Sequence, residues 1–185
     1  METIRSAISA IVASIQPFDQ EESEHIHFTH GWIESGAYLF RTNKPALPLI
    51  HLVSYFVVFD QRNNQILLVD HKKSNLWLPP GGHVEPEEDP KETVKREIKE
   101  ELGIEADFIF DDPIFLTVTN TANCEDAHTD VSLWYVVKGN SDQPLRYDRE
   151  EFHQIHWYTL DNIPFECSDL HLQRFIHKFV SYLAK

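Results

Sequence analysis

Residues 82–104 read GHVEPEEDPKETVKREIKEELGI and carry the strongest structural signal in the 185-residue chain. The part from about Lys91 to Leu102 has the apolar spacing of an amphipathic helix, and Gly103 predicts its end. Successive helical residues are rotated by about 100°, so side chains three or four positions apart share a face. One stripe should face the core (Val94, Ile98 and Leu102), and another should face water (Glu92, Lys95 and Lys99).

A third stripe of this helix consists of carboxylates. Glu97, Glu100 and Glu101 fall within an arc of roughly 100° and therefore share one face. Like charges four positions apart destabilise a helix, and the helix dipole disfavours anions in the last turns. A divalent cation would remove both penalties, and hard oxygen ligands suit Mg²⁺ or Mn²⁺. The alternative interpretation is a glutamate-rich face that is only solvated.

The spacing of the residues around this helix resembles a known motif. Gly82 is followed by five residues, Glu88, seven residues, Arg96-Glu97-Ile98, one residue, Glu100-Glu101, one residue and Gly103-Ile104. This pattern is similar to the Nudix box, G-x5-E-x7-R-E-U-x-E-E-x-G-U with U aliphatic, and it matches at every defined position. The resemblance implies a Nudix fold and a pyrophosphohydrolase that cleaves a phosphoanhydride in a nucleotide-like substrate with Mg²⁺ or Mn²⁺.

The resemblance also implies roles for individual residues. The metal ligands would be the carboxylate row and one loop carbonyl, which correspond here to Glu97, Glu100, Glu101 and Gly82. Structural support would come from Glu88, Gly81 and Gly103. The adjacent glycines Gly81 and Gly82 would also allow the backbone to approach metal and phosphate closely. Arg96 could pair with Glu88 and brace the loop, or hold Glu97 in position.

The catalytic group predicted from the resemblance comprises Glu97, Arg96 and Glu100. Glu97 is the first choice for the general base that takes a proton from water. Some members of the family use a carboxylate from a later loop instead. Here the alternative bases are Asp148, Glu150 and Glu151, which directly precede a predicted strand.

The composition restricts the partners of the protein. With 16 basic and 30 acidic residues, the net charge is −14 and no basic stripe is visible, which argues against duplex nucleic acid as a partner. No apolar run approaches the roughly 18 residues of a membrane span, and residues 1–15 lack the features of a signal peptide. Cys124 and Cys167 lie far apart, in keeping with a reducing compartment. We expect a soluble cytoplasmic protein.

The rest of the chain predicts an α/β (α+β) protein in which a mixed sheet is sandwiched between helices. Residues 1–48 should form a helical N-terminal extension, and residues 49–185 a Nudix domain with a C-terminal helix. Helical patterns cover residues 4–15, 21–36 and 168–184, with Pro17 and Gly36 as stop signals, and strand patterns cover residues 49–60, 65–71, 104–110, 113–120, 130–139 and 152–160. Residues 77–90 read as a Pro/Gly loop without helix or sheet interior, and residues 42–48 as the boundary.

Signals for the substrate are weaker. Candidate substrate contacts are Lys72, Lys73, Trp77, His83 and His128, although each also suits an ordinary surface or core role. Nudix subgroups for ADP-ribose often carry a proline where this chain has Thr119, and a tyrosine associated with dinucleoside polyphosphates is missing at Asn120 and Thr121. These absences favour nucleoside triphosphates.

Other functions stay open at this point. A Nudix-fold module could sense a nucleotide without cleaving it, but such modules would be expected to lose box carboxylates. An isomerase would need a proton-transferring cysteine, for which Cys124 is the candidate. The N-terminal extension could cap the fold, cover the substrate cleft or form a homodimer contact.

Overall fold

The computed structural model describes residues 3–42, 47–121 and 127–184. Seven strands form one mixed sheet in the order β3-β2-β1-β6-β5, with β4 paired to β1 and β7 to β2. The elements along the chain are α1 (Ile4–Ser14), α2 (Gln20–Glu34), β1 (Ile50–Asp60), β2 (Gln65–His71), β3 (Leu76–Leu78), β4 (Gly81–His83), α3 (Pro90–Leu102), β5 (Phe115–Asn120), β6 (Thr129–Lys138), β7 (Phe152–Thr159), the 3-10 helix η1 (Phe165–Cys167) and α4 (Leu172–Leu183). The predicted α+β class with N-terminal helices is confirmed.

The described residues divide into two compact units. The first comprises residues 1–55, 82–94 and 112–135, and the second comprises residues 56–81, 95–111 and 136–185. Several elements, including β1, β6 and α3, begin in one unit and end in the other. Each unit is described by itself below.

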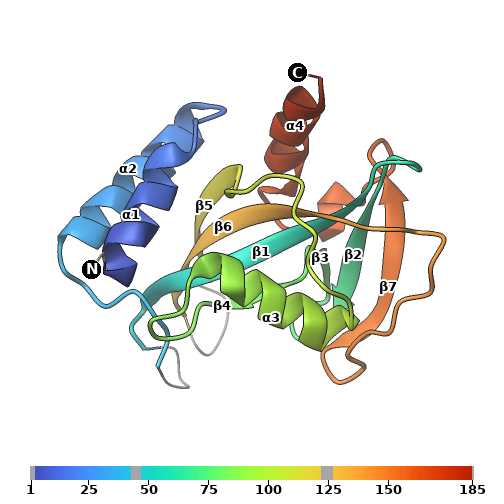
Figure 1. Cartoon of the computed structure of the whole chain (residues 1–185), viewed down its shortest axis with the longest axis horizontal. Coiled ribbons are helices and arrows are strands. Elements are labelled where there is room, and N and C mark those ends of the chain that lie inside the picture. The colour runs from blue at the N-terminus through green and yellow to red at the C-terminus, as the bar shows by residue number, and fades with distance from the viewer. Residues whose placement is uncertain (1–2, 43–46, 122–126, 185) are drawn as a thin grey trace. The chain divides into compact units, whose positions relative to one another are not determined.

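In the first unit, two N-terminal helices and a strand pair form the core. α1 and α2 lie side by side (Figure 1), and Ile8, Val12 and Ile33 are buried between and beneath them. α2 also contacts β5, which pairs antiparallel with β6 from Phe115↔Trp134 to Asn120↔Thr129. The apolar spacing that predicted the first helix is therefore the spacing of its buried face.

A buried carboxylate fastens α2 to this strand pair. Glu22 is fully buried, and its two carboxylate oxygens accept hydrogen bonds from the backbone N–H groups of Phe18 and Leu116 at 2.7 and 3.2 Å. The side chain of Asp19 caps the helix by accepting from the N–H of Glu22. The N-terminal helices are thus bonded to β5 as well as packed on it.

In the second unit, β2 is the central strand. It pairs antiparallel with the end of β1 (Asp60↔Gln65), with β3 (Asp70↔Trp77) and with β7 (Gln65↔Thr159). Figure 1 shows β7 beside β2. α4 packs on this part of the sheet through Phe179, whose ring meets Phe59 edge-on at 4.9 Å.

Two sequence predictions are wrong. Residues 77–90 are not loop throughout, because they contain parts of β3 and all of β4, and Val84 N–H donates to Leu52 O beside β4. Residues 104–110 do not form a strand: Phe108 makes only an isolated bridge to Val137, so the β-forming side chains have no continuous ladder partner. Residues 43–46 of the predicted boundary, and Cys124, lie outside the described residues.

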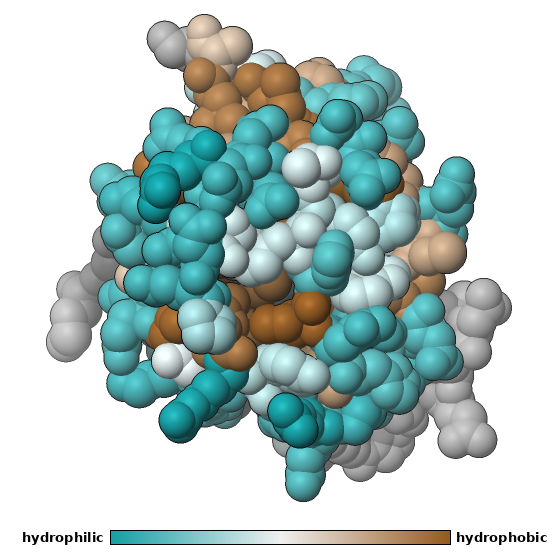
Figure 2. Space-filling model, turned by 90° about the vertical axis from the view of Figure 1, so that its right-hand side faces the viewer, coloured by the Kyte–Doolittle hydropathy of each residue, from teal (hydrophilic) through white to brown (hydrophobic). Residues whose placement is uncertain are grey.

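One face of the molecule is largely hydrophilic (Figure 2). Figure 2 shows a face on which hydrophilic side chains predominate and apolar side chains gather in smaller patches. Within residues 3–42, 47–121 and 127–184, no helix has the length and apolar character that a membrane crossing requires.

Candidate functional site

The helix α3 has the three faces that its sequence predicts. Val94, Ile98 and Leu102 are 0% exposed and belong to the core. Glu92, Lys95 and Lys99 are exposed to solvent. Gly103 ends the helix with a φ of 67°, a value that glycine adopts without strain, and its N–H donates to Lys99 O.

The carboxylate row on α3 runs from buried to exposed. Glu101 is only 4% exposed, whereas the side chain of Glu97 is 14% exposed and that of Glu100 is 63% exposed. The three glutamates are therefore not equivalent, although they share one helix face. Glu101 is the one that most needs a partner for its negative charge.

The surroundings of Glu101 make its charge costly. Burial raises the pKa of Glu101 well above its ordinary value, and the nearby carboxylates of Glu97, Glu151 and Asp148 raise it further. A hydrogen bond from the Gly81 N–H acts in the opposite direction. Among the residues that the structure describes, the Oε2 atom of Glu101 has no hydrogen-bond partner. A cation at this position would satisfy that oxygen and lower the repulsion.

Arg96 holds the second carboxylate of the row. Its Nη1 atom lies 2.6 Å from Glu97 Oε1 and 3.8 Å from Glu100 Oε2. Burial raises the pKa of Glu97, the hydrogen bond and charge of Arg96 lower it, and Glu100 and Glu151 raise it. Of the two pairings predicted for Arg96, the structure shows the one with Glu97; the pairing with Glu88 stays a prediction.

Two of the three later carboxylates lie close to the row. Asp148 and Glu151 are near enough to raise the pKa of Glu101, and the Asp148 N–H donates to Glu101 O at 2.8 Å. Glu150 and Glu151 are both exposed, and the Glu150 N–H donates to Asp148 Oδ1 at 2.7 Å. The effect of Asp148 and Glu151 on the pKa of Glu101 favours these two as alternative bases, and their role stays a prediction.

Of the predicted structural supports, Glu88 lies in the loop before α3. The Glu88 carboxylate accepts hydrogen bonds from the Thr93 hydroxyl at 2.7 Å and from the Glu85 N–H at 3.0 Å, which ties the loop to the first turn of the helix. Gly81 and Gly82 belong to β4. The use of the Gly82 carbonyl as a metal ligand stays a prediction.

Two of the candidate substrate contacts, Lys72 and Trp77, have partners within the protein. Lys72 and Lys73 are exposed in the turn after β2, and Lys72 Nζ donates to Arg149 O at 2.5 Å. The Trp77 ring packs edge-on against the Tyr158 ring, with ring centres 5.4 Å apart. The backbone carbonyl of Trp77 accepts a hydrogen bond from the Ser168 hydroxyl. A substrate role for these residues stays a prediction.

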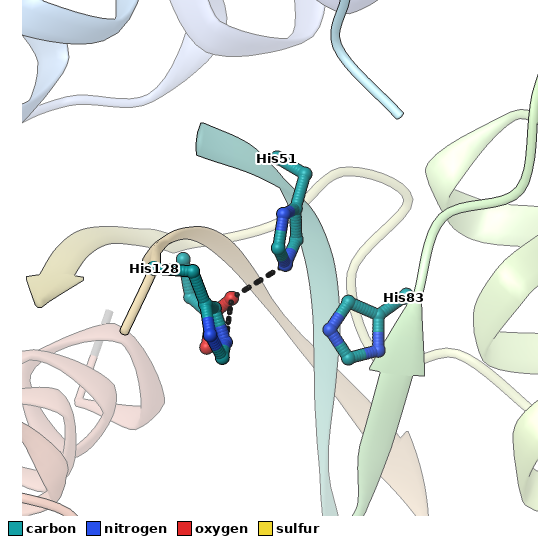
Figure 3. A group of neighbouring side chains, drawn as sticks. His51, His83 and His128 are labelled. Carbon is teal, nitrogen blue, oxygen red and sulfur yellow. Dashed lines mark ion pairs between the residues drawn. The ribbon is translucent and has the colours of Figure 1, made fainter. Parts of the chain in front are cut away.

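The other two candidates, His83 and His128, lie together with two residues that the sequence analysis did not single out. His51 and Asp130 complete a cluster in which four ligand atoms lie within 4.8 Å of one another (Figure 3). Nothing in the sequence reveals this cluster, because its members are far apart along the chain and come together only through strand pairing.

The fold and the acidic helix describe an α+β protein with a candidate site for a divalent cation on one helix. A mixed sheet carries helices, and one helix that follows a Pro/Gly-rich segment presents a row of carboxylates with a buried, unpartnered oxygen. Oxygen ligands of this kind suit divalent cations such as Mg²⁺. Asp148 and Glu151 add further negative charge to the same place.

Comparisons with known proteins give the family. Residues 50–179 match the NUDIX domain, so the chain belongs to the NUDIX family. It is 47% identical over 53 residues to the human nucleoside diphosphate-linked moiety X motif 6, and 47% identical over 51 residues to a putative 8-oxo-dGTP diphosphatase of Bacillus subtilis (strain 168). Each match covers 28% of this chain, but only 17% and 34% of those relatives.

Solved structures agree with the fold. A NUDIX-family hydrolase from Clostridium perfringens superimposes with a TM-score of 0.56, at 20% identity, over 72% of this chain and 97% of that one. At that identity the likeness concerns the fold alone. The predicted family and fold are confirmed.

Proposed function

We propose that the protein is a pyrophosphohydrolase that depends on Mg²⁺ or Mn²⁺ and cleaves a phosphoanhydride in a nucleoside diphosphate linked to another moiety. Nucleoside triphosphates are the favoured form of that substrate. The observation that carries the proposal is the buried Glu101, whose Oε2 atom has no partner among the described residues while three other carboxylates crowd it. The names of the human and Bacillus relatives point to the same substrate class.

The residues present fit a divalent cation. Glu97, Glu100, Glu101 and the carbonyl of Gly82 would hold it, and they offer only oxygen atoms. When bound, such a cation neutralises the charge of the diphosphate and makes a water molecule more acidic. This neutralisation is needed for an anionic substrate to approach a protein whose net charge is −14.

The chain itself supplies the base and its orientation. Glu97 would accept the proton of the attacking water, and its pKa, raised by burial, makes it a stronger proton acceptor than an exposed glutamate. Arg96, at 2.6 Å from Glu97 Oε1, fixes the direction of that carboxylate. It is a positioning residue, since it acts through Glu97. Asp148 and Glu151 are the alternative bases.

The proposal is tested by assaying a panel of nucleoside di- and triphosphates, nucleotide sugars, dinucleotides and coenzyme A for released phosphate or pyrophosphate. We expect turnover with Mg²⁺ or Mn²⁺ and none in EDTA. Glu101→Gln should lower kcat by at least about a hundredfold without loss of folding. The exposed Glu105, which pairs with Lys99 at 2.8 Å, provides the control Glu105→Gln, for which we expect wild-type turnover.

Near-normal turnover of Glu101→Gln would refute the assignment of the metal site. Tight binding of a nucleotide without turnover across the panel would instead support the non-catalytic sensor module. Restoration of activity by Zn²⁺ alone would contradict hard-ligand chemistry.

A further inference from the structure

The first unit contains a compact group of metal-ligating side chains that the proposed hydrolysis does not use. His51 lies in β1, His83 in β4, His128 directly before β6 and Asp130 within β6. The ligand atoms of these four residues lie within 4.8 Å of one another, and the rings of His51 and His128 stack at 4.9 Å. Figure 3 shows the three imidazoles arranged around a common point. Residues from three strands therefore converge on one place.

His51 presents a buried ring nitrogen to the group. His51 is 0% exposed, and its Nδ1 atom lies 3.0 Å from Pro48 O. A carbonyl oxygen can only accept, so Nδ1 donates this hydrogen bond and Nε2 is the ring nitrogen that is directed to the group. Nε2 lies 3.1 Å from Asp130 Oδ1. Within the described part of the chain, neither atom has a hydrogen-bond partner.

Two distances in the group are close to those between neighbouring ligand atoms of a metal ion. His51 Nε2 and His128 Nε2 lie 3.1 and 3.3 Å from the same Asp130 oxygen. In a tetrahedral zinc site with bonds of about 2.0–2.1 Å, neighbouring ligand atoms are separated by about 3.3 Å. Both histidine nitrogens are thus separated from the Asp130 oxygen by nearly the ligand spacing of such a site. The hydrogen bond from His51 Nδ1 to a backbone carbonyl is the support that zinc-bound histidines usually have.

His83 can complete the group, but Arg41 competes with a metal ion for its ring nitrogen. The ligand atom of His83 lies within 4.8 Å of those of the other three residues. Arg41 Nη1 lies 3.1 Å from His83 Nε2 and donates to that atom. A metal would have to displace this guanidinium to gain the fourth ligand.

We propose that His51, His128 and Asp130, joined by His83 when Arg41 moves away, form a second metal site that takes Zn²⁺ or a similar transition-metal ion. Imidazole ligands suit such ions, whereas the glutamates of α3 suit Mg²⁺ or Mn²⁺, so the two sites differ in chemistry. The central carboxylate of Asp130 opposes an anion at this point. A bound ion would join β1, β4 and β6 within the first unit.

The test uses the full-length protein freed of metal by a chelator and then kept in excess Mg²⁺. Titration with Co²⁺, followed by visible absorption, and with Zn²⁺, followed by calorimetry, should show one equivalent per chain with the intense absorption of tetrahedral Co²⁺. Asp130→Asn and His128→Gln should each weaken the affinity by at least about tenfold. His51 is avoided because its complete burial makes substitutions there prone to disrupt folding.

Three variants make the result specific. His177→Gln, on the exposed side of α4, should bind Co²⁺ like the wild type. Glu101→Gln should also leave Co²⁺ binding unchanged, which separates this site from the acidic row. Arg41→Met should tighten binding, because it removes both the hydrogen-bond donor to His83 Nε2 and a positive charge.

The proposal is overturned if no equivalent of Co²⁺ or Zn²⁺ binds, or if Asp130→Asn and His128→Gln, shown to be folded by their melting curves, bind as tightly as the wild type. Loss of binding in Glu101→Gln would overturn it too, because it would assign the ion to the acidic row.

Discussion

Glu101 and its neighbours set the chemistry at the scale of single residues. A carboxylate that is 4% exposed, with one oxygen unpartnered among the described residues, is destabilising unless a positive charge compensates it. Arg96 compensates Glu97 at 2.6 Å, but burial and the surrounding carboxylates leave the pKa of Glu101 high. This environment of Glu101 supports the proposed cation site.

Arg96 should affect the pH dependence of turnover. Its hydrogen bond and charge lower the pKa of Glu97, so Arg96→Ala should raise that pKa. A base must be deprotonated to act, so the acidic limb of the kcat profile should move to higher pH, and kcat should fall by about 10- to 100-fold with a smaller change in KM. Steady-state kinetics between about pH 5 and 9 measure both effects.

The control for Arg96→Ala is Lys99→Ala, since Lys99 is exposed and pairs with Glu105 away from the carboxylate row. Its profile should match the wild type. If Arg96→Ala lowers kcat but leaves the acidic limb in place, Glu97 is not the base, and Asp148 and Glu151 become the candidates.

Gly139 is a residue at which packing leaves no room for a side chain. A Cβ atom there would lie 2.5 Å from Trp157 Cη2 and 2.6 Å from Val58 Cγ1. Gly139→Ala should therefore lower the free energy of unfolding by about 1–3 kcal/mol, as measured by urea denaturation. Gly31→Ala is the matched control, because nothing lies within 4 Å of a Cβ there and the helix α2 should gain about 0.5–1 kcal/mol. Equal stability of the two variants would contradict the packing argument.

At the scale of elements, the N-terminal helices are held by specific bonds. Glu22 of α2 reaches β5, where it accepts from the Leu116 N–H. We propose that residues 1–48 act as a stabilising cap, because α2 contacts β5 and its buried carboxylate bonds to that strand.

Glu22→Ala should lower the free energy of unfolding by about 2–3 kcal/mol, because it removes a charged acceptor from two buried or half-buried N–H groups. The exposed Glu24 provides the control Glu24→Ala, for which we expect a change within about 0.5 kcal/mol. Chemical denaturation gives both values. The folded Glu22→Ala protein should keep the kcat of the wild type; a large loss of kcat would make the extension part of the active site instead of a cap.

The elements also show what the sequence can predict. The helix α3 was predictable because its apolar, charged and acidic residues repeat with the helical period, and the final glycine marks its end. Residues 104–110 have strand-forming side chains as well, but only Phe108 finds a partner in Val137. Whether a β-like segment forms a ladder depends on distant strands, which local patterns do not contain.

At the scale of the whole molecule, the sequence predicted the family and the acidic row but not the histidine cluster. The row lies on one helix, so its spacing is readable directly. His51, His83, His128 and Asp130 are brought together by three strands. The sequence also indicated Asp148 and Glu151 as alternative general bases. Their effect on the pKa of Glu101, however, depends on the fold and could not be predicted.

Stability of the metal-free protein should depend on pH through Glu101. Its pKa in the folded state lies above the ordinary value of 4.5, so the folded state binds more protons than the unfolded state above that pH. Without divalent metal, the melting temperature should therefore fall as the pH rises above about 4.5 and level off once the folded-state pKa is passed. In Glu101→Gln this fall should be reduced.

Saturating Mg²⁺ should remove much of the fall in the wild type, because a bound cation favours the ionised carboxylate. Melting curves in EDTA and in Mg²⁺ across the pH range measure it. An identical pH dependence in Glu101→Gln and in the wild type, both in EDTA, would show that other groups control the stability.

The most direct measurement of the acidic site is Mn²⁺ binding, followed by electron paramagnetic resonance of the free ion. It should be made in the Asp130→Asn background, so that the histidine cluster cannot contribute. The protein should bind Mn²⁺, and adding Glu101→Gln should weaken that binding by at least about tenfold. Equal Mn²⁺ affinity with and without Glu101→Gln, in proteins with matching melting curves, would contradict the account.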